Sequence, residues 1–243
     1  MEARKVEPAH GRLWIKQGWE IFKKAPVLWV VLSALFATGP TLISNIPVIG
    51  EPLATLLVPV LLGGLMLGCQ ALERGEHLML GHLFAGFHQR AQQLIALGGI
   101  GMVWAVLTEL LMRLVGGAAL VETMSSTQPE QDPTAMLNAI TDASGAWVLG
   151  GVMICAYLMA SMFAPMLVLF DGMGPIDALK TSFKACMKNI GPLFVYGLVI
   201  VLLALLTIMT MGLGLVILLP LSQTSAYAAY RDIFKAQGGN PTT

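Results

Sequence analysis

Two long apolar runs near the end of the chain constrain its fold more than any other feature. They cover residues 191–211 and 213–230 and are separated by almost nothing. A helix needs about 20 apolar residues to cross the hydrocarbon core of a bilayer, and both runs have about that length. A basic segment, residues 174–189, precedes them and places apolar and charged side chains on opposite faces of a helix. The pattern predicts a surface helix followed by a membrane hairpin.

The same plan recurs twice upstream, which predicts three hairpins, each preceded by an amphipathic interfacial helix. Charged residues make up 12% of the chain, whereas a soluble domain has about 25%. We therefore predict an all-α, polytopic helical membrane protein that forms a single membrane domain over residues 1–243. The six expected transmembrane helices cover about 27–43, 53–72, 93–117, 147–170, 191–211 and 213–230. The expected amphipathic segments are 10–24, 77–90 and 174–189.

The second and third amphipathic segments indicate an internal repeat. Adding 96 to five helically spaced apolar positions in and just after the second segment gives five apolar positions in and just after the third. Leu83 then matches Leu179, and Phe87 matches Phe183. The agreement lies more in pattern than in identity, and it predicts a threefold repeat of hairpin units. The paired positions are 80, 83, 87, 91 and 94 in the second segment and 176, 179, 183, 187 and 190 in the third.

The distribution of basic residues predicts the orientation in the membrane. Every lysine and arginine except Arg113 lies in a terminal tail or in a link that follows the second or fourth span. Cytoplasmic loops carry an excess of such residues, so both termini and all three amphipathic segments are expected in the cytoplasm. The stretch 121–146 has acidic residues and no basic one, and it is expected to form a loop on the outer side.

Glu109 and Arg113 form the charge pair that lies inside an apolar run. A charge at the bilayer centre costs about 2.5–3.5 kcal/mol, so an intramembrane charge is a functional candidate by default. The spacing of four residues, with the acid first, favours an ion pair on one helix face. Both residues lie in the outer third of their span, where they can also pair at the interface without a further role. A gating or substrate-binding role is the other interpretation.

Span four carries a stripe of sulfur-containing side chains at helical spacing: Cys155, Met159, Met162 and Met166. Copper(I) prefers such soft ligands, so the stripe is a weak candidate for a copper site. Methionine is also an ordinary filler of gaps between helices, and this interpretation needs no metal. We predict no cofactor, because no catalytic, metal or nucleotide-binding motif stands out elsewhere, and we expect no enzymatic activity.

Polar residues interrupt span six at Gln223 and Thr224, followed by Tyr227. Polar side chains inside a helical bundle usually form hydrogen bonds to a neighbouring helix. The alternative is that these three residues line a substrate cavity.

The amphipathic segments are expected to form a basic and aromatic collar in the inner leaflet. Trp19 and Lys23 belong to the first segment, and Lys180, Lys184 and Lys188 belong to the third. Each lysine near an anionic surface contributes about 1 kcal/mol of attraction. The collar either anchors the hairpins only, or it recognises lipid headgroups or a membrane or cytoplasmic protein partner.

Three short motifs carry a resemblance to known proteins. They are Gly18-Trp19-x-x-Phe22-x-x-x-Pro26, the run GHLFAGF at 81–87 and the ending AYAAYRD at 226–232. The chain resembles an uncharacterised family of six-span bacterial inner-membrane proteins. More distantly, it resembles the membrane domains attached to some glycerophosphodiester phosphodiesterases. The resemblance implies a multi-pass protein of the bacterial inner membrane without the phosphodiesterase catalytic domain, and it implies nothing about mechanism.

The leading functional hypothesis is a non-enzymatic membrane protein that acts as an accessory, scaffold or lipid-organising factor through its cytoplasmic collar. The expected partners are anionic lipids of the inner leaflet and a membrane or cytoplasmic protein, and no nucleic acid is expected. The alternative is a transporter or channel for small molecules or ions, with a cavity lined by span six and by the Glu109–Arg113 pair.

Overall fold

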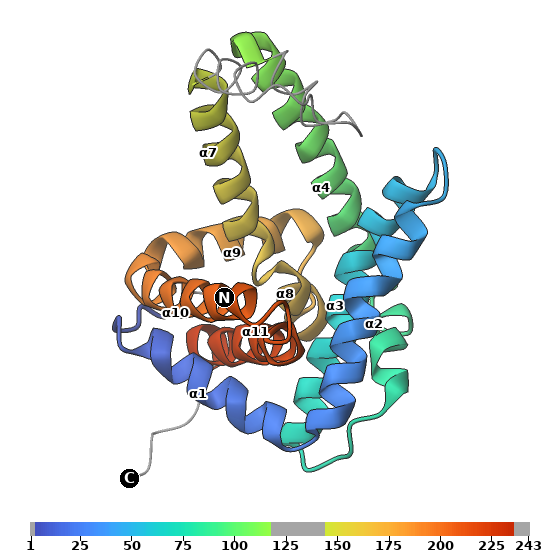
Figure 1. Ribbon diagram of the computed structural model, residues 1–243, viewed down its shortest axis with the longest axis vertical. Helices are drawn as coiled ribbons and strands as arrows, with labels where there is room; N and C mark the ends of the chain where they lie inside the picture. The colour runs from blue at the N-terminus through green and yellow to red at the C-terminus, as the bar shows by residue number, and fades with distance from the viewer. Residues whose placement is uncertain (1–2, 118–143, 236–243) are drawn as a thin grey trace. The chain divides into compact units, whose positions relative to one another are not determined.

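The computed structural model describes residues 3–117 and 144–235, and within these ranges the regular structure is entirely helical (Figure 1). The chain forms two compact units. The first comprises Met1–Gly99 and Met159–Thr243, and the second comprises Ile100–Leu158. The all-α fold of a polytopic membrane protein is confirmed.

The first unit contains most of the helices. They are α1 (His10–Lys23), α2 (Pro26–Ser44), α3 (Gly50–Glu73), the 3-10 helix η1 (Leu80–Phe87), α8 (Ala164–Asp171), α9 (Pro175–Lys188), α10 (Ile190–Met209), α11 (Leu215–Tyr230) and the π-helical turn η3 (Arg231–Lys235). The second unit is built from most of α4 (Ala91–Met112), the π-helical turn η2 (Arg113–Gly117) and most of α7 (Ser144–Ser161), whose ends at 91–99 and 159–161 belong to the first unit. The predicted acidic loop 121–146 lies outside the described residues except for its last three, which begin α7.

Five segments of the described chain are long and apolar enough to cross a membrane. They are Pro26–Ser44, Gly50–Glu73, Ala91–Val115, Ser144–Asp171 and Ile190–Met209. These segments coincide with the first five predicted spans. Helix α11 occupies the sixth position but has 16 residues, with Pro220 inside it. It is short for a bilayer crossing, so the count of six spans stays a prediction.

The fourth predicted span is broken in the structure. Helix α7 ends at Ser161, and α8 begins at Ala164 with Pro165 in its first turn. Proline has no backbone N–H, and its ring clashes with the carbonyl group four residues earlier, here that of Ser161. A continuous helix is therefore interrupted at residues 162–163, and a proline in the first turn of the new helix costs nothing.

The first amphipathic segment packs against protein over its apolar face. Helix α1 lies along α11 and also touches α10 (Figure 1). Trp14 is completely buried, and Ile21 and Phe22 are buried beside it. A Cβ atom at Gly18 would stand 2.6 Å from the backbone nitrogen of Ser225, so only glycine allows this close approach of two helices.

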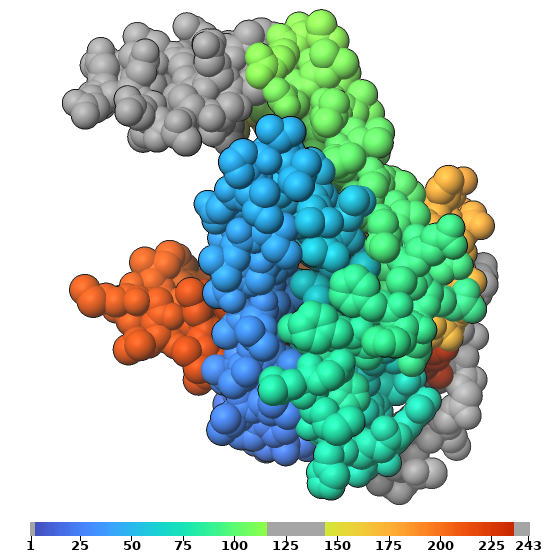
Figure 2. All heavy atoms as spheres, turned by 90° about the vertical axis from the view of Figure 1, so that its right-hand side faces the viewer, coloured from blue at the N-terminus to red at the C-terminus, as the bar shows by residue number. Residues whose placement is uncertain are grey.

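The second amphipathic segment differs from the prediction. In place of a helical segment over 77–90, the structure has the 3-10 helix η1, followed by Arg90 at a φ of 53° and then by α4. Leu83 is buried against α3, whereas Leu80, Phe84 and Phe87 are exposed. The segment that contains η1 is the blue-green surface beside the blue α2 in Figure 2. A 3-10 helix has three residues per turn, so an apolar face spaced for an α-helix cannot stay on one side.

The internal repeat is not confirmed. The second segment forms a 3-10 helix, whereas the third forms the 14-residue α-helix α9. Positions that match in the sequence after an offset of 96, such as Phe87 and Phe183, therefore lie in different kinds of helix. The threefold repeat stays a prediction.

Candidate functional site

Helix α9 has three distinct faces. Small residues are buried against the rest of the first unit: Ala178, Ser182, Ala185 and Cys186. Large apolar side chains are exposed on the next face, with Ile176 60%, Phe183 37% and Met187 50% exposed. The third face carries Lys180, Lys184 and Lys188, which are also exposed. A helix that packs through small residues and leaves an apolar stripe beside a basic stripe is suited to a membrane interface.

Ser182 attaches α9 to the break in the fourth span. Its hydroxyl group donates to the carbonyl oxygen of Met159 at 2.8 Å and accepts from the backbone N–H of Phe163 at 3.1 Å. These are backbone groups around the interruption at 162–163. A buried backbone group without a partner is costly in a membrane protein, and a serine from another helix supplies the missing bonds.

Cys186 lies one turn further along the same buried face. Its thiol group donates to the carbonyl oxygen of Met159 at 3.3 Å. Burial raises the pKa of the thiol to about 12, although the neighbouring Ser182 side chain acts in the opposite direction. The group is therefore protonated at neutral pH, and a protonated thiol is a poor nucleophile and a poor metal ligand.

The end of α9 holds the N-terminal segment of the chain. The side chain of Asn189 is buried and accepts from the backbone N–H of Val6 at 2.9 Å. It also donates to the carbonyl oxygen of Arg4 at 2.9 Å. Lys188 donates to the carbonyl oxygen of Ala3 at 2.7 Å. Lys188 thus forms a hydrogen bond within the protein, whereas the side chains of Lys180 and Lys184 are exposed.

Three acidic residues at helix ends join the helices of the first unit. Glu73, the last residue of α3, accepts a hydrogen bond from the Tyr227 hydroxyl group at 2.9 Å and pairs with Arg231. Asp171, the last residue of α8, accepts from Tyr230 and pairs with Lys235. The same short stretch of chain, from the end of α11 into η3, therefore supplies all four partners.

The third acid, Asp232, fixes α1. It pairs with Arg4, and its Oδ2 atom lies 2.6 Å from Nδ1 of His10. The indole N–H of Trp14 donates to the same oxygen at 2.8 Å. Sequence reasoning missed this charged junction of Glu73, Asp171 and Asp232. The signal was present, because Glu73 and Asp171 each end an apolar run and Asp232 closes the motif AYAAYRD.

The polar residues predicted in span six are buried in helix packing. Gln223 accepts a hydrogen bond from the Ser33 hydroxyl group of α2 at 2.7 Å. Thr224 donates to the carbonyl oxygen of Pro220 at 3.0 Å, and Tyr227 donates to Glu73. All three side chains are buried. Their geometry fits hydrogen bonding within and between helices, and they line neither of the two cavities described below.

The predicted collar residues of α1 lie at its surface. Trp19 is 37% exposed and stacks at a tilt on Phe22 with 5.2 Å between the ring centroids. Lys23 pairs with Glu20 at 2.9 Å. Unlike α9, α1 combines these residues with an apolar face that is covered by α10 and α11.

The candidate copper ligands do not follow one continuous helix. Cys155 and Met159 lie on α7, Met162 lies in the break, and Met166 is buried on α8. The interruption at Pro165 removes the spacing on which the stripe was based. Among the described residues, no group of three or more histidine, cysteine, aspartate or glutamate side chains is arranged to hold a metal ion.

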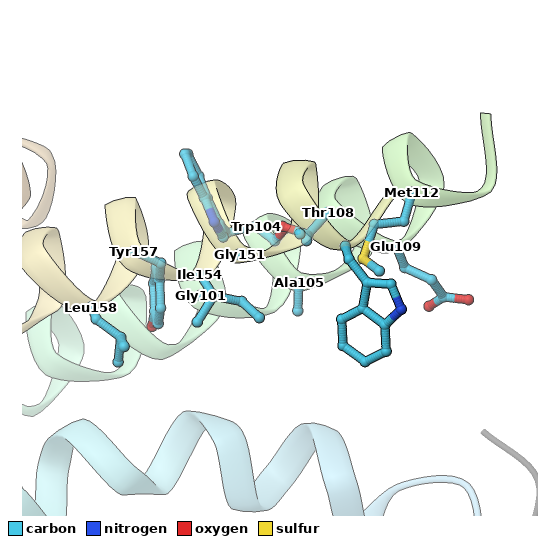
Figure 3. A pocket seen from close by; sticks show the side chains of 12 residues that line it. Gly101, Trp104, Ala105, Thr108, Glu109, Met112, Gly151, Ile154, Tyr157 and Leu158 are labelled. Carbon is cyan, nitrogen blue, oxygen red and sulfur yellow. The ribbon is translucent and has the colours of Figure 1, made fainter. Parts of the chain in front are cut away.

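A groove between α4 and α7 lies within the second unit (Figure 3). Its volume is about 480 Å³. Trp104 and Tyr157 stack across it with 6.4 Å between their ring centroids, and the Trp104 indole N–H donates to the Met153 carbonyl oxygen at 3.1 Å. Glu109 lines the groove and pairs with Arg113 at 2.8 Å, and both side chains are about half exposed. A second, smaller cavity of about 150 Å³ lies between α10 and α11.

Comparison with known proteins identifies a relative of similar length. A protein of Burkholderia thailandensis, named as a probable inner membrane protein, is 28% identical over 262 residues, which cover 98% of this chain and 95% of the relative. No family model matches the chain. No solved structure matches it. None of these findings supports the resemblance to glycerophosphodiester phosphodiesterases. The apolar helices and the similarity together show an integral membrane protein with several membrane-spanning helices.

Proposed function

We propose that this chain is a non-enzymatic protein of the bacterial inner membrane that binds and organises anionic lipids through α9. The name of the Burkholderia thailandensis relative supports the location. The observation that carries the functional part is the exposure of Ile176, Phe183 and Met187 beside Lys180 and Lys184 on one helix. The small-residue face holds the helix on the protein, which leaves the other two faces for the lipid.

The geometry suits the inner boundary of a bilayer. An interfacial helix inserts its apolar face about 5–10 Å below the headgroups while its basic residues stay at their level. Two lysines near an anionic surface together contribute about 2 kcal/mol of attraction, which corresponds to roughly a 30-fold change in affinity. Helix α1 carries similar charges, but Trp14, Ile21 and Phe22 are buried, and its exposed apolar residues, Leu13 and Trp19, are less than 40% exposed. It therefore offers less apolar surface for insertion than α9 does.

The test compares two double charge reversals of equal size. Lys180→Glu with Lys184→Glu alters α9, and Arg12→Glu with Lys16→Glu alters the exposed side of α1. Native mass spectrometry of protein released from membranes rich in phosphatidylglycerol measures the anionic lipid that each variant retains. We expect a loss of at least roughly 30-fold for the α9 variant, because reversal removes two attractive charges and adds two repulsive ones, and a much smaller loss for the α1 variant. Equal losses in both variants, or no loss in the α9 variant, would contradict the proposal.

A transport function has weaker support. The polar residues expected to line its cavity, Gln223, Thr224 and Tyr227, are buried and hydrogen bonded in helix packing. A carrier needs polar groups that can exchange their partners for a substrate. We therefore do not propose transport through span six.

A further inference from the structure

The groove in the second unit has the length of one bilayer leaflet. Figure 3 shows Tyr157 and Leu158 towards one end and Glu109 and Met112 towards the other. From Gly101 to Met112 the helix rises about 16 Å at 1.5 Å per residue. Half the hydrocarbon core of a bilayer is about 15 Å thick. The groove therefore matches the depth that one acyl chain occupies.

Three glycine residues shape the groove. A Cβ atom at Gly101 would overlap the Tyr157 hydroxyl group, and one at Gly150 would stand 2.7 Å from the sulfur atom of Met112. At Gly151, by contrast, nothing lies within 4 Å of an added Cβ atom. The first two glycines let α4 and α7 approach, and the third leaves the opening between them. The volume of about 480 Å³ lies within the usual range for a bound small molecule, about 300–1,000 Å³.

The charged end of the groove has one group of each sign. Arg113 donates through two nitrogen atoms, at 2.8 and 3.0 Å, and both bonds end on Oε1 of Glu109. Because both side chains are about half exposed, each can reach a second partner. A carboxylate binds an ammonium group and a guanidinium group binds a phosphate. An ion pair at this position therefore complements a headgroup that carries both an ammonium group and a phosphate.

We propose that the groove between α4 and α7 binds one phospholipid with a zwitterionic headgroup, namely an ammonium group and a phosphate. One acyl chain lies along Gly101, Ala105 and Gly151. The ammonium group binds Glu109 and the phosphate binds Arg113, so the ion pair opens into two contacts with the lipid. This site differs from the α9 surface in its residues and in headgroup chemistry. The charged face of α9 carries three lysines and one acid, Asp177, so its net charge is positive and it favours net negative lipids.

The first experiment fills the groove. Gly151→Leu places a side chain in the open space, and Gly197→Leu on α10 is the matched control, because nothing lies within 4 Å of a Cβ atom there either. Purified full-length protein is exchanged into nanodiscs with equal amounts of phosphatidylethanolamine and phosphatidylglycerol, and native mass spectrometry counts the lipids retained. We expect Gly151→Leu to lower retained phosphatidylethanolamine at least tenfold and Gly197→Leu to leave it unchanged. Equal retention in both variants overturns the proposal.

A second pair of variants tests the headgroup and keeps the groove. Glu109→Gln removes the acceptor for the ammonium group, and Arg113→Gln removes the donor to the phosphate. We expect Glu109→Gln to reduce the preference for phosphatidylethanolamine over phosphatidylglycerol at least fivefold, and Arg113→Gln to weaken both lipids. An unchanged preference in Glu109→Gln overturns the headgroup assignment even if Gly151→Leu fails to fold. The Lys180→Glu with Lys184→Glu variant should retain phosphatidylethanolamine, which separates this site from the proposed function of α9.

Discussion

Helices α1 and α9 share an amphipathic pattern but lie in different environments. Each has 14 residues, with apolar and basic side chains on different faces. Helix α1 buries three large residues, Trp14, Ile21 and Phe22, whereas the buried residues of α9 are all small. The difference follows from what each helix touches, since α1 lies along α11 and α9 covers the broken span. Amphipathic spacing predicts that a helix has an apolar face, but the spacing does not predict what covers that face.

The largest contrast is expected from removing one large apolar side chain of each helix. Trp14→Ala should lower the free energy of unfolding by about 3–5 kcal/mol, because the indole is completely buried and bonded to Asp232. Phe183→Ala should cost about 1 kcal/mol, because Phe183 is 37% exposed and does not belong to the buried core. Denaturant titration in one detergent measures both variants. Similar losses would show that the two helices pack alike.

Asp232 should be the next most important residue for holding α1. Asp232→Asn keeps the shape but removes the charge that pairs with Arg4 and accepts from Trp14. We expect a loss of about 2 kcal/mol, because hydrogen bonds to charged groups contribute about 1.5–3 kcal/mol. Hydrogen exchange should rise in α1 and stay unchanged in α9. Faster exchange in α9 as well would mean that the junction holds both helices.

Ser182 provides the corresponding test for α9. Ser182→Ala leaves the backbone N–H of Phe163 without the hydroxyl group that it donates to. An unsatisfied buried group costs about 1–3 kcal/mol, and we expect a value near the lower limit. Ser182→Thr retains the hydroxyl group and is the conservative comparison. Limited proteolysis near residues 162–163 should accelerate in the alanine variant; an unchanged rate would argue against this anchor.

The smallest effect is expected for the rate of cysteine alkylation, which distinguishes the buried face of α9 from its exposed face. The pKa of Cys186 is raised to about 12 by burial, so its reactive thiolate form is scarce below that pH and increases only as the pH approaches 12. An alkylating reagent at pH 8 should label Cys186 far more slowly than a cysteine introduced at Lys184, which is exposed. Peptide mass spectrometry measures the two rates. Comparable rates would show that the small-residue face is open.

The sequence predicted the features that depend on local composition. Apolar runs located the five membrane-spanning segments, because bilayer thickness alone sets their length. The break at 162–163 was missed, although Pro165 signals it, because the hydropathy of the run continues through the proline. The charged junction was missed for another reason. Glu73 and Arg231 are far apart in the chain, and no local periodicity reports a contact of that kind.

The most direct measurement is photocrosslinking at one position on each helix. A photoreactive apolar residue replaces Met187 on the exposed face of α9 or Ile21 on the buried face of α1, and the protein stays in its native membrane. We predict a phospholipid adduct at position 187, and at position 21 a crosslink within the chain. A crosslink to protein at position 187, or equal lipid adducts at both positions, would contradict the assignment of α9 as the lipid-binding helix.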